Sequence, residues 1–517
     1  MKPANALSTA ALFAAGVAVM LPWLNPFAPG PSPAVGPLLV SFGATVFLFL
    51  VAFLYAFPDG LTSKKTVLQN CWLPIAIAWL LAGVLSTLIS LLQYFGLAHV
   101  MDPWISQTRW PGEAFANLRQ RNLFASLTNI SLAALVFIAL KTSGVGSKYG
   151  NKLLSLWLAA AGLLSVGNAI SSSRTGLVEL VLLCILYGVW GKWREPVVRR
   201  VLVCSVLVYA IAVFAMPYLA GLDLSTHGAI ARMDNNERCG SRLTLWSNVL
   251  HLIAQKPWFG WGLAELDYAH FITLYNEPRF CDILDNAHSL PLHLAVELGV
   301  PFALLICGGF GWWVVSQKPW AEADPTRQMA WTVLAVILLH SMLEYPLWYG
   351  PFQMAFGICL LLLWRQKPTA ETKKNPKKVI NRPLALILYA QAATVLIAFI
   401  LYAAWDYNRI SQIYLQPESR NAAYRNDTLN KIRSSWLFAD QVRFAELLVT
   451  PLTQANAEWT FNTATTLLHY SPEPRVVERL IESSVMLGRD DEAIGYLARY
   501  KAAFPKEPAV CTIDPAL

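Results

Sequence analysis

Long apolar runs recur along most of this chain, and their length is the feature that most limits its fold. An α-helix needs roughly 20 apolar residues to cross the hydrocarbon core of a bilayer. Charged residues make up only 14% of the 517 residues, whereas they make up about a quarter of a soluble domain. The sequence therefore predicts an all-α polytopic membrane protein.

We expect about eleven transmembrane helices from these runs. The first run follows Lys2 and could be a cleaved signal peptide, but the many later runs favour an uncleaved first span. Together the runs predict a transmembrane domain over residues 1–404. The expected spans lie near 6–24, 34–56, 72–97, 123–140, 153–171, 175–191, 201–219, 289–315, 328–345, 349–364 and 383–404.

Lysine and arginine gather in alternate connections between these spans, for example at Lys64 and Lys65 and at Arg199 and Arg200. This is the positive-inside bias, and it places the N-terminus in the cytoplasm. The formal net charge of +8 is then largely a topological signal, so no nucleic-acid partner is expected. An odd number of spans puts the loop 98–122, the long loop 220–288 and the tail 405–517 on the outer side.

The tail 405–517 is polar and predicts amphipathic helices near 435–451, 457–469, 475–487 and 491–503. Glu473-Pro474 recurs as Glu507-Pro508, a spacing of 34 residues (507 − 473). That spacing is the period of tetratricopeptide-like helical pairs. The tail is expected to be a tetratricopeptide-like helical domain, with an irregular helical cap as the alternative.

The loop 220–288 carries arginines and a histidine that could act on an anionic substrate. Arg232 and Arg238 stand just before the segment 241–246, which contains Arg242 and is expected to be a helix on the membrane surface. Each arginine could also be a solvated surface charge. Arg174 follows a row of serines at the outer end of a span; it either snorkels to the interface or anchors a phosphate through its forked guanidinium.

His288 stands at the expected start of the helix 289–315, and Gly299 follows eleven residues later (299 − 288) on nearly the same face. A histidine at the outer mouth of a span could be a general base, because its pKa lies near neutrality. A lone histidine at a helix start could equally cap or stabilise the helix.

Two further polar clusters lie at outer span ends. His340 and Glu344 are spaced i,i+4, and Tyr345-Pro346 then ends the helix. This pair could form a structural hydrogen bond, orient a substrate or supply half of a metal site. The basic cluster Gln120-Arg121-Asn122 could line the same substrate cavity as His340 and Glu344, or it could form a positively charged loop.

Cys239 and Cys281 share the outer loop, where disulfides persist, so we expect a bridge between them. The sequence has no CxxC pair, no HExxH, no Walker loop and no GxGxxG after a strand. Neither a metal nor a cofactor is therefore expected.

These residues together resemble the O-antigen ligase superfamily, and within it the bacterial PglL-type O-linked protein oligosaccharyltransferases. His288, Ser289 and Gly299 match the superfamily pattern, while Phe302 departs from its last position. The stretch His340-Ser341-Met342-Leu343-Glu344-Tyr345-Pro346-Leu347-Trp348-Tyr349 looks like the protein-glycosylating branch. The block 242–246 with Pro257, Gly260 and Gly262 resembles the family's long periplasmic loop.

The resemblance implies an enzyme of the bacterial inner membrane with its active site on the periplasmic side. Its partners would be an oligosaccharide on undecaprenyl pyrophosphate, membrane lipid and a pilin-like acceptor protein that offers a Ser or Thr hydroxyl. Arg174 and Arg242 would bind the pyrophosphate, and His288 would deprotonate the acceptor. Glu344 and His340, with Tyr345, Gln120, Arg121 and Asn122, would complete the substrate site.

Other functions remain open at this stage. A ligase that joins O-antigen to lipid A core, or an O-antigen polymerase, would share the arginine-and-histidine loop. A transporter of lipid-linked sugars would need polar residues at mid-membrane on several spans and symmetric halves, which are not evident in the sequence. A structural scaffold would leave the arginines unexplained.

Overall fold

The computed structural model describes residues 3–56, 72–143, 150–222, 240–365 and 382–507, and every regular element in these ranges is a helix. The contacts divide the chain into two compact units. The first unit comprises residues 1–28, 32–235 and 317–402, and the second comprises 29–31, 236–316 and 403–517. One unit passes into the other within helix α16 (Arg382–Ser411). The domain boundary at residue 404 stays a prediction.

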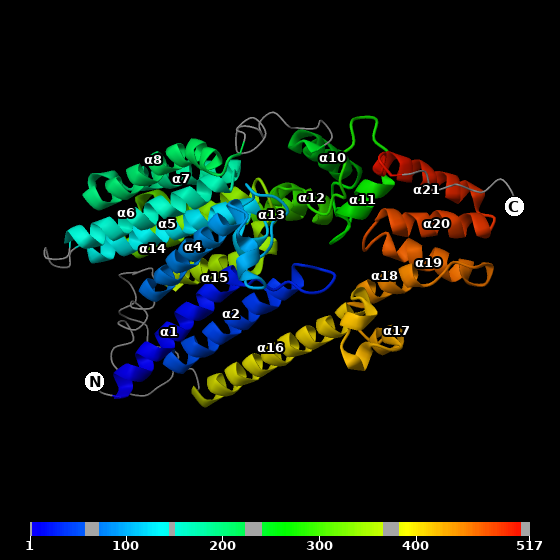
Figure 1. Ribbon diagram of the computed structural model, residues 1–517, viewed down its shortest axis with the longest axis horizontal. Helices are drawn as coiled ribbons and strands as arrows, with labels where there is room; N and C mark the ends of the chain where they lie inside the picture. Colours follow the sequence, from blue (N-terminus) through cyan, green and yellow to red (C-terminus); the bar gives the residue numbers. More distant parts are fainter. Residues whose placement is uncertain (1–2, 57–71, 144–149, 223–239, 366–381, 508–517) are drawn as a thin grey trace. The chain divides into compact units, whose positions relative to one another are not determined.

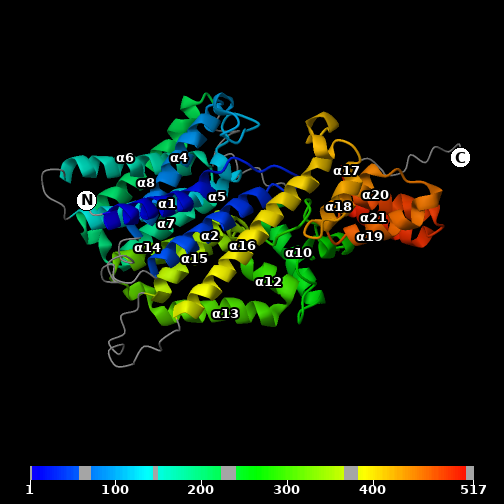
Figure 2. The same ribbon diagram turned by 90° about the horizontal axis from the view of Figure 1, so that it is seen from below.

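The first unit is a bundle of long helices that run side by side, as Figures 1 and 2 show. It contains α1 (Pro3–Leu24), α2 (Val35–Ala56), α4 (Trp72–Tyr94), α5 (Arg121–Thr142), α6 (Gly150–Ile170), α7 (Arg174–Val189), α8 (Pro196–Leu219), α14 (Pro325–Ser341), α15 (Gly350–Arg365) and most of α16. The short 3-10 turns η1 (Ala98–Met101), η2 (Ala116–Leu118), η3 (Lys192–Arg194), η5 (Pro319–Ala321) and η6 (Pro346–Trp348) join them.

Helix α5 is the centre of this bundle. It packs against α4, α6, α7, α8 and α14, and most of its side chains are buried. Serine and glycine let its neighbours approach closely: a Cβ on Gly83 of α4 would collide with Ser131 of α5. Close contact through small residues is how helices associate in a bilayer, where no hydrophobic effect drives them together.

Seven of the described helices are long and apolar enough to cross a membrane: α2, α4, α5, α6, α8, α13 and α16. Helices α1 and α15 contain shorter apolar stretches, and α7 and α14 have 16 and 17 residues. All four coincide with expected spans. The prediction of a polytopic helical membrane protein is therefore confirmed, while the number of about eleven spans stays a prediction.

The second unit combines the long loop with the tail. It contains α10 (Arg242–Gln255), α11 (Leu266–Ile272), α12 (Leu290–Leu298), α13 (Val300–Gln317), the end of α16, α17 (Thr428–Ile432), α18 (Ala439–Val449), α19 (Ala457–Leu467), α20 (Pro474–Met486) and α21 (Asp490–Ala503). The 3-10 turns η7 (Gln412–Tyr414), η8 (Pro417–Ser419), η9 (Ala422–Tyr424) and η10 (Gln454–Asn456) complete it. Helices α18 to α21 match the predicted tail helices within a few residues; their repeat character stays a prediction.

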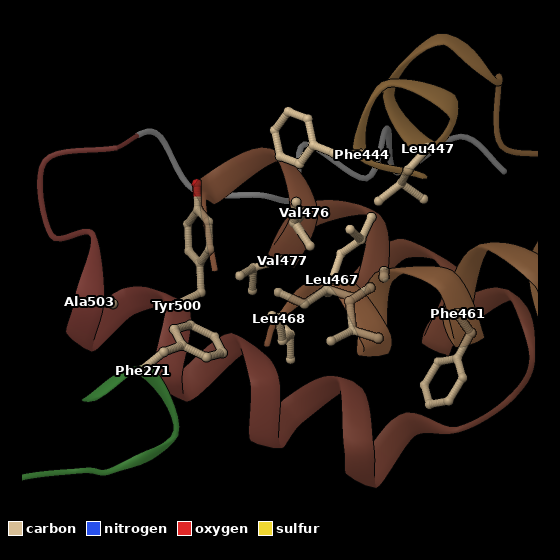
Figure 3. Packing of buried hydrophobic residues seen from close by; sticks show 13 residues of the cluster. Phe271, Phe444, Leu447, Phe461, Leu467, Leu468, Val476, Val477, Tyr500 and Ala503 are labelled. Carbon is tan, nitrogen blue, oxygen red and sulfur yellow. The ribbon is translucent and has the colours of Figure 1, made fainter. Parts of the chain in front are cut away.

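A buried cluster joins loop and tail inside this unit. Phe271 of α11 is only 2% exposed and packs among side chains of α18 to α21. Figure 3 shows its ring beside Tyr500 and Ala503, with Leu468 close by. Arg499 of α21 also donates a hydrogen bond of 2.9 Å to the carbonyl of Ile272. The loop helix α11 is therefore part of the core of the tail.

The expected single span 289–315 is wrong. The chain forms two helices there, α12 and α13, which are separated by Gly299. Gly299 has φ +88° and ψ 157°, a conformation that is essentially restricted to glycine. A Cβ at this position would also collide with the carbonyl of Trp258. A tertiary contact therefore breaks a run that its composition alone would make continuous.

Candidate functional site

Asn122 forms hydrogen bonds to two other segments of the first unit that carry predicted site residues. It lies in the first turn of α5, and its amide Nδ2 donates to Glu344 Oε1 at 3.2 Å. Its Oδ1 accepts a hydrogen bond from Ser173 Oγ at 2.6 Å. One side chain thus connects the start of α5, the start of α7 and the segment after α14.

Arg174 is the first residue of α7, directly after this contact. Ser173 is the N-cap, and its Oγ accepts the backbone N–H of Gly176. A Cβ on Gly176 would collide with Ala125 of α5 and Asn168 of α6, so only glycine lets α7 begin this close to both helices. Arg174 itself is exposed, and within the described ranges no carboxylate or hydrogen-bond acceptor is paired with it. Its guanidinium is therefore available to an anion.

Gln120 and Arg121 have local partners that the sequence did not indicate. Gln120 is the N-cap of α5 and accepts the backbone N–H of Leu123 at 2.9 Å. Arg121 forms an ion pair of 2.9 Å with Glu113, and both side chains are 24% exposed. The charge of Arg121 is thus already balanced by a carboxylate of the same loop.

Glu344 lies beyond the helix in which we expected it. Helix α14 ends at Ser341, although the backbone N–H of Glu344 still bonds to the carbonyl of His340 at 2.8 Å. Tyr345 follows in a turn and stacks on Tyr349, with ring centroids 6.1 Å apart. Glu344 therefore lies in the turn that follows the helix containing His340. The two side chains contact different residues: Glu344 bonds to Asn122, and His340 lies next to Ser126.

His340 is buried in a polar network that the sequence analysis missed. Its Nδ1 lies 2.7 Å from Ser126 Oγ, which donates to Glu179 Oε1 at 2.5 Å. Asn129 donates to the other carboxylate oxygen of Glu179 at 3.0 Å. Glu179 is the only charged residue in the expected span 175–191, and a charged group inside a span is a recognised signal of function or of a buried network. That signal was available in the sequence.

Arg242 and His288 lie in the second unit, on segments that contact each other. Arg242 is the first residue of α10, which confirms the expected helix, and Ser241 is its N-cap. One turn later Trp246 donates its indole N–H to the carbonyl of Ala287 at 3.1 Å. This bond ties the first turns of α10 to the residue that precedes His288.

His288 does not begin a helix. Helix α12 starts at Leu290 with Ser289 as N-cap, and His288 has φ +48° in the preceding turn. Its backbone N–H donates to Asn286 Oδ1 at 2.8 Å. Because Gly299 follows the end of α12 and has an extended positive-φ conformation, it does not share a helix face with His288. The side chain of His288 is half-buried.

The block 257–262 explains the position of Gly299. Trp261 and Gly262 donate their backbone N–H groups to the carbonyls of Val296 and Glu297, both at 2.9 Å. The last carbonyls of a helix have no hydrogen-bond partner inside the helix. Here the backbone N–H groups of the block are their partners. The block thus fixes the C-terminal end of α12, while His288 precedes its N-terminal end.

The predicted disulfide partner Cys239 lies outside the described residues, as do Arg232 and Arg238. Cys281 is half-buried. A Cβ on Gly240, which follows Cys239 in the chain, would lie 3.9 Å from the sulfur of Cys281. The bridge stays a prediction that this proximity supports.

The predicted site residues therefore form two groups. Asn122, Arg174, Glu344 and His340 belong to the first unit, whereas Arg242 and His288 belong to the second. That both groups line one hollow stays a prediction. Among the residues that the structure describes, no group of His, Cys, Asp and Glu could hold a metal ion.

Helical spans with a buried polar network, joined to a loop that carries arginine and histidine, define a polytopic helical membrane protein. Comparison with known families makes this more specific. Residues 159–307 match the O-antigen ligase family, residues 114–138 match a protein glycosylation ligase, and residues 328–514 match the C-terminal part of a virulence factor membrane-bound polymerase. Over residues 159–307, therefore, the chain is similar to the O-antigen ligase family.

Two relatives come from Acinetobacter baylyi. A general O-oligosaccharyltransferase is 26% identical over 313 residues, which cover 58% of this chain and 52% of the relative. A ComP-specific O-oligosaccharyltransferase is 24% identical over 314 residues, which cover 60% of this chain and 54% of the relative. The chain thus spans about half the length of these relatives. No solved structure matches it.

Proposed function

We propose that this protein is an O-oligosaccharyltransferase of the bacterial inner membrane. It would move an oligosaccharide from undecaprenyl pyrophosphate to a Ser or Thr hydroxyl of a pilin-like protein on the periplasmic side. The observation that carries the proposal is the contact of Asn122 with both Ser173 and Glu344, which brings Arg174 and the segment 340–349 to one end of the helical bundle. The names of the two relatives support the same class of reaction.

The roles follow from the chemistry of glycosyl transfer. The bond between the sugar C1 and the pyrophosphate oxygen breaks, and a bond forms between C1 and the acceptor oxygen. His288 takes the hydroxyl proton as general base, and Arg174 and Arg242 bind the negative charge of the departing pyrophosphate. Glu344, which Asn122 holds, and the neighbouring Tyr345 orient the acceptor.

The acceptor is tested with the full chain in lipid nanodiscs and an undecaprenyl-pyrophosphate-linked glycan. Purified pilin and lipid A core are offered as acceptors in parallel, and mass spectrometry measures the products. Glycosylated pilin is expected. Product on lipid A core alone would instead establish a ligase of O-antigen, which the match of residues 159–307 would also accommodate.

The base is tested by His288→Ala. We expect transfer to fall by about 100-fold or more, because general base catalysis contributes about that much, while the protein stays in the membrane fraction. His251→Ala is the matched control, because His251 is an exposed histidine of α10 in the same unit. Undiminished transfer by His288→Ala would remove this residue as the base.

A further inference from the structure

An apolar groove runs between α7 and α8 in the first unit. It encloses about 720 Å³ and contains no charged side chain. Leu177, Val181 and Ile185 follow one another along α7, and Tyr209 and Phe214 face them from α8. The groove ends near Trp193, whose indole N–H is bonded to the carbonyl of Cys184 at 2.9 Å. We call this feature the α7–α8 groove.

The groove exists because α7 and α8 have few contacts with each other. The turn η3 reverses the chain between them, and α8 packs mainly against α6. Leu177, Val181 and Ile185 are 42%, 50% and 56% exposed, while Leu180 at the floor is 3% exposed. The wall that α7 contributes is therefore exposed at several positions along the helix.

Arg174 lies at one end of the groove. Leu177 follows it by three residues, so both lie on neighbouring positions of one helix face. Arginine is unfavourable at the first position of a helix because the N-terminal end of the helix carries partial positive charge. The exposed guanidinium and the helix end together favour an anion directly above an apolar channel.

We propose that the α7–α8 groove receives the polyprenyl chain of the glycan donor while Arg174 contacts its pyrophosphate. This inference rests on the proposed function. Anion and chain are covalently joined, so a pyrophosphate at Arg174 must send its first isoprene units into the nearest apolar space, which begins at Leu177. Apolar contact gives little net affinity inside a bilayer. The groove acts by shape: it leaves room for the chain that follows the pyrophosphate, and a side chain that fills it excludes that chain and weakens donor binding.

The test fills the groove. Ala210 lines it from α8 and is exposed, so Ala210→Trp adds bulk without disturbing the bundle core. Leu207→Trp is the control, because Leu207 is 57% exposed on the same helix but does not line the groove. Both variants and the unmodified protein are assayed with the same pyrophosphate-linked glycan on an undecaprenyl chain and on a chain of two isoprene units.

We expect Ala210→Trp to raise KM for the undecaprenyl donor by about fivefold or more, the effect of a typical overpacking penalty. Its kcat should stay unchanged, and its KM for the short donor should rise as well, because the two isoprene units of that donor are the ones that enter the groove first. Leu207→Trp should resemble the unmodified protein with both donors. Equal KM values in all three proteins would overturn the inference.

A binding measurement separates this inference from the proposed function. Undecaprenyl pyrophosphate with a photoreactive group in its first isoprene units is crosslinked to the full chain in nanodiscs, and the modified peptides are identified. We expect labelling within 174–218 that Ala210→Trp abolishes, even if no acceptor is glycosylated. Labelling elsewhere overturns the inference, as does equal labelling of the groove by a photoreactive phosphatidylethanolamine at the same concentration.

Discussion

The arginines predicted to bind substrate share one position: Arg121, Arg174 and Arg242 each begin a helix, after the N-caps Gln120, Ser173 and Ser241. Positive charge is disfavoured there unless an anion compensates it. For Arg121 the anion is the carboxylate of Glu113. Arg174 has no such carboxylate among the described residues, so a bound pyrophosphate is the compensating group that we propose.

The forked geometry of Arg174 is the property to test at this scale. Arg174→Lys keeps the charge but loses bidentate binding, and Arg174→Ala loses both. We expect KM for the lipid-linked donor to rise by about tenfold in the lysine variant and further in the alanine variant. Arg194→Lys, in η3 beyond the other end of α7, is the control and should leave KM unchanged. A lysine variant with an unchanged KM would contradict bidentate binding.

At the scale of elements, the break between α12 and α13 decides where the span begins and how the loop before it is held. Val300 donates its N–H to the carbonyl of Pro257 at 2.8 Å, so the start of α13 is joined to the block 257–262. Gly260, with φ +69°, lies against the end of α12, and a Cβ on it would collide with Glu297. Gly260 and Gly299 therefore allow the backbone of the block 257–262 to contact the backbone at the end of α12.

Gly299→Ala should loosen this contact. The substitution forces an alanine into a conformation that costs about 1–3 kcal/mol, and its Cβ meets the carbonyl of Trp258. We expect faster hydrogen exchange in 257–300 and reduced transfer. Gly311→Ala on α13 is the matched control, because a Cβ there meets nothing within 4 Å. Unchanged exchange in Gly299→Ala would show that the glycine is not required.

The buried pair His293–Glu297 of α12 gives a pH dependence. The two side chains are 3.4 Å apart, and burial lowers the pKa of His293 to about 4 and raises the pKa of Glu297 to about 7. A raised carboxyl pKa means that Glu297 contributes stability fully below its ordinary pKa of 4.5, and that this contribution is lost as pH rises through 7.

The glutamine in Glu297→Gln cannot ionise, so the variant should not lose stability at this position as pH rises through 7. Its oxygen can still accept the N–H of Ala264, which now bonds to Glu297 Oε1 at 3.0 Å. We expect the variant to protect 290–298 from hydrogen exchange better than the unmodified protein at pH 8, with the difference vanishing near pH 4.5. Glu277→Gln, at an exposed glutamate of the same loop, should show no such trend. A difference that does not depend on pH would contradict the ionisation argument.

For the molecule as a whole, the loop and the tail form one unit although more than a hundred residues separate them in sequence. His469 Nδ1 lies 2.7 Å from Glu265 Oε2, and its ring stacks on Tyr268 with centroids 3.7 Å apart. Phe271 enters the tail core (Figure 3). The tail thus supports the loop that carries Arg242 and His288.

Phe271→Ala tests this coupling. Removal of a buried phenylalanine costs about 3–5 kcal/mol, and we expect faster hydrogen exchange in both 265–290 and 457–503. Leu274→Ala, two residues beyond α11 and 54% exposed, should leave both segments unchanged. An effect confined to the loop would mean that the tail folds independently of it.

The sequence by itself determined the class of protein, the approximate ends of most helices of the bundle and the helices of the tail, because run length, charge bias and amphipathic period are local properties. It also identified Asn122, Arg174 and Glu344 as polar residues at span ends. Only the tertiary structure decided that Asn122 bonds to both Ser173 and Glu344, that Glu179 joins Ser126 and His340, and that Gly299 divides an apolar run. Those outcomes depend on which segments approach each other, and side-chain packing sets that approach rather than any pattern along the chain.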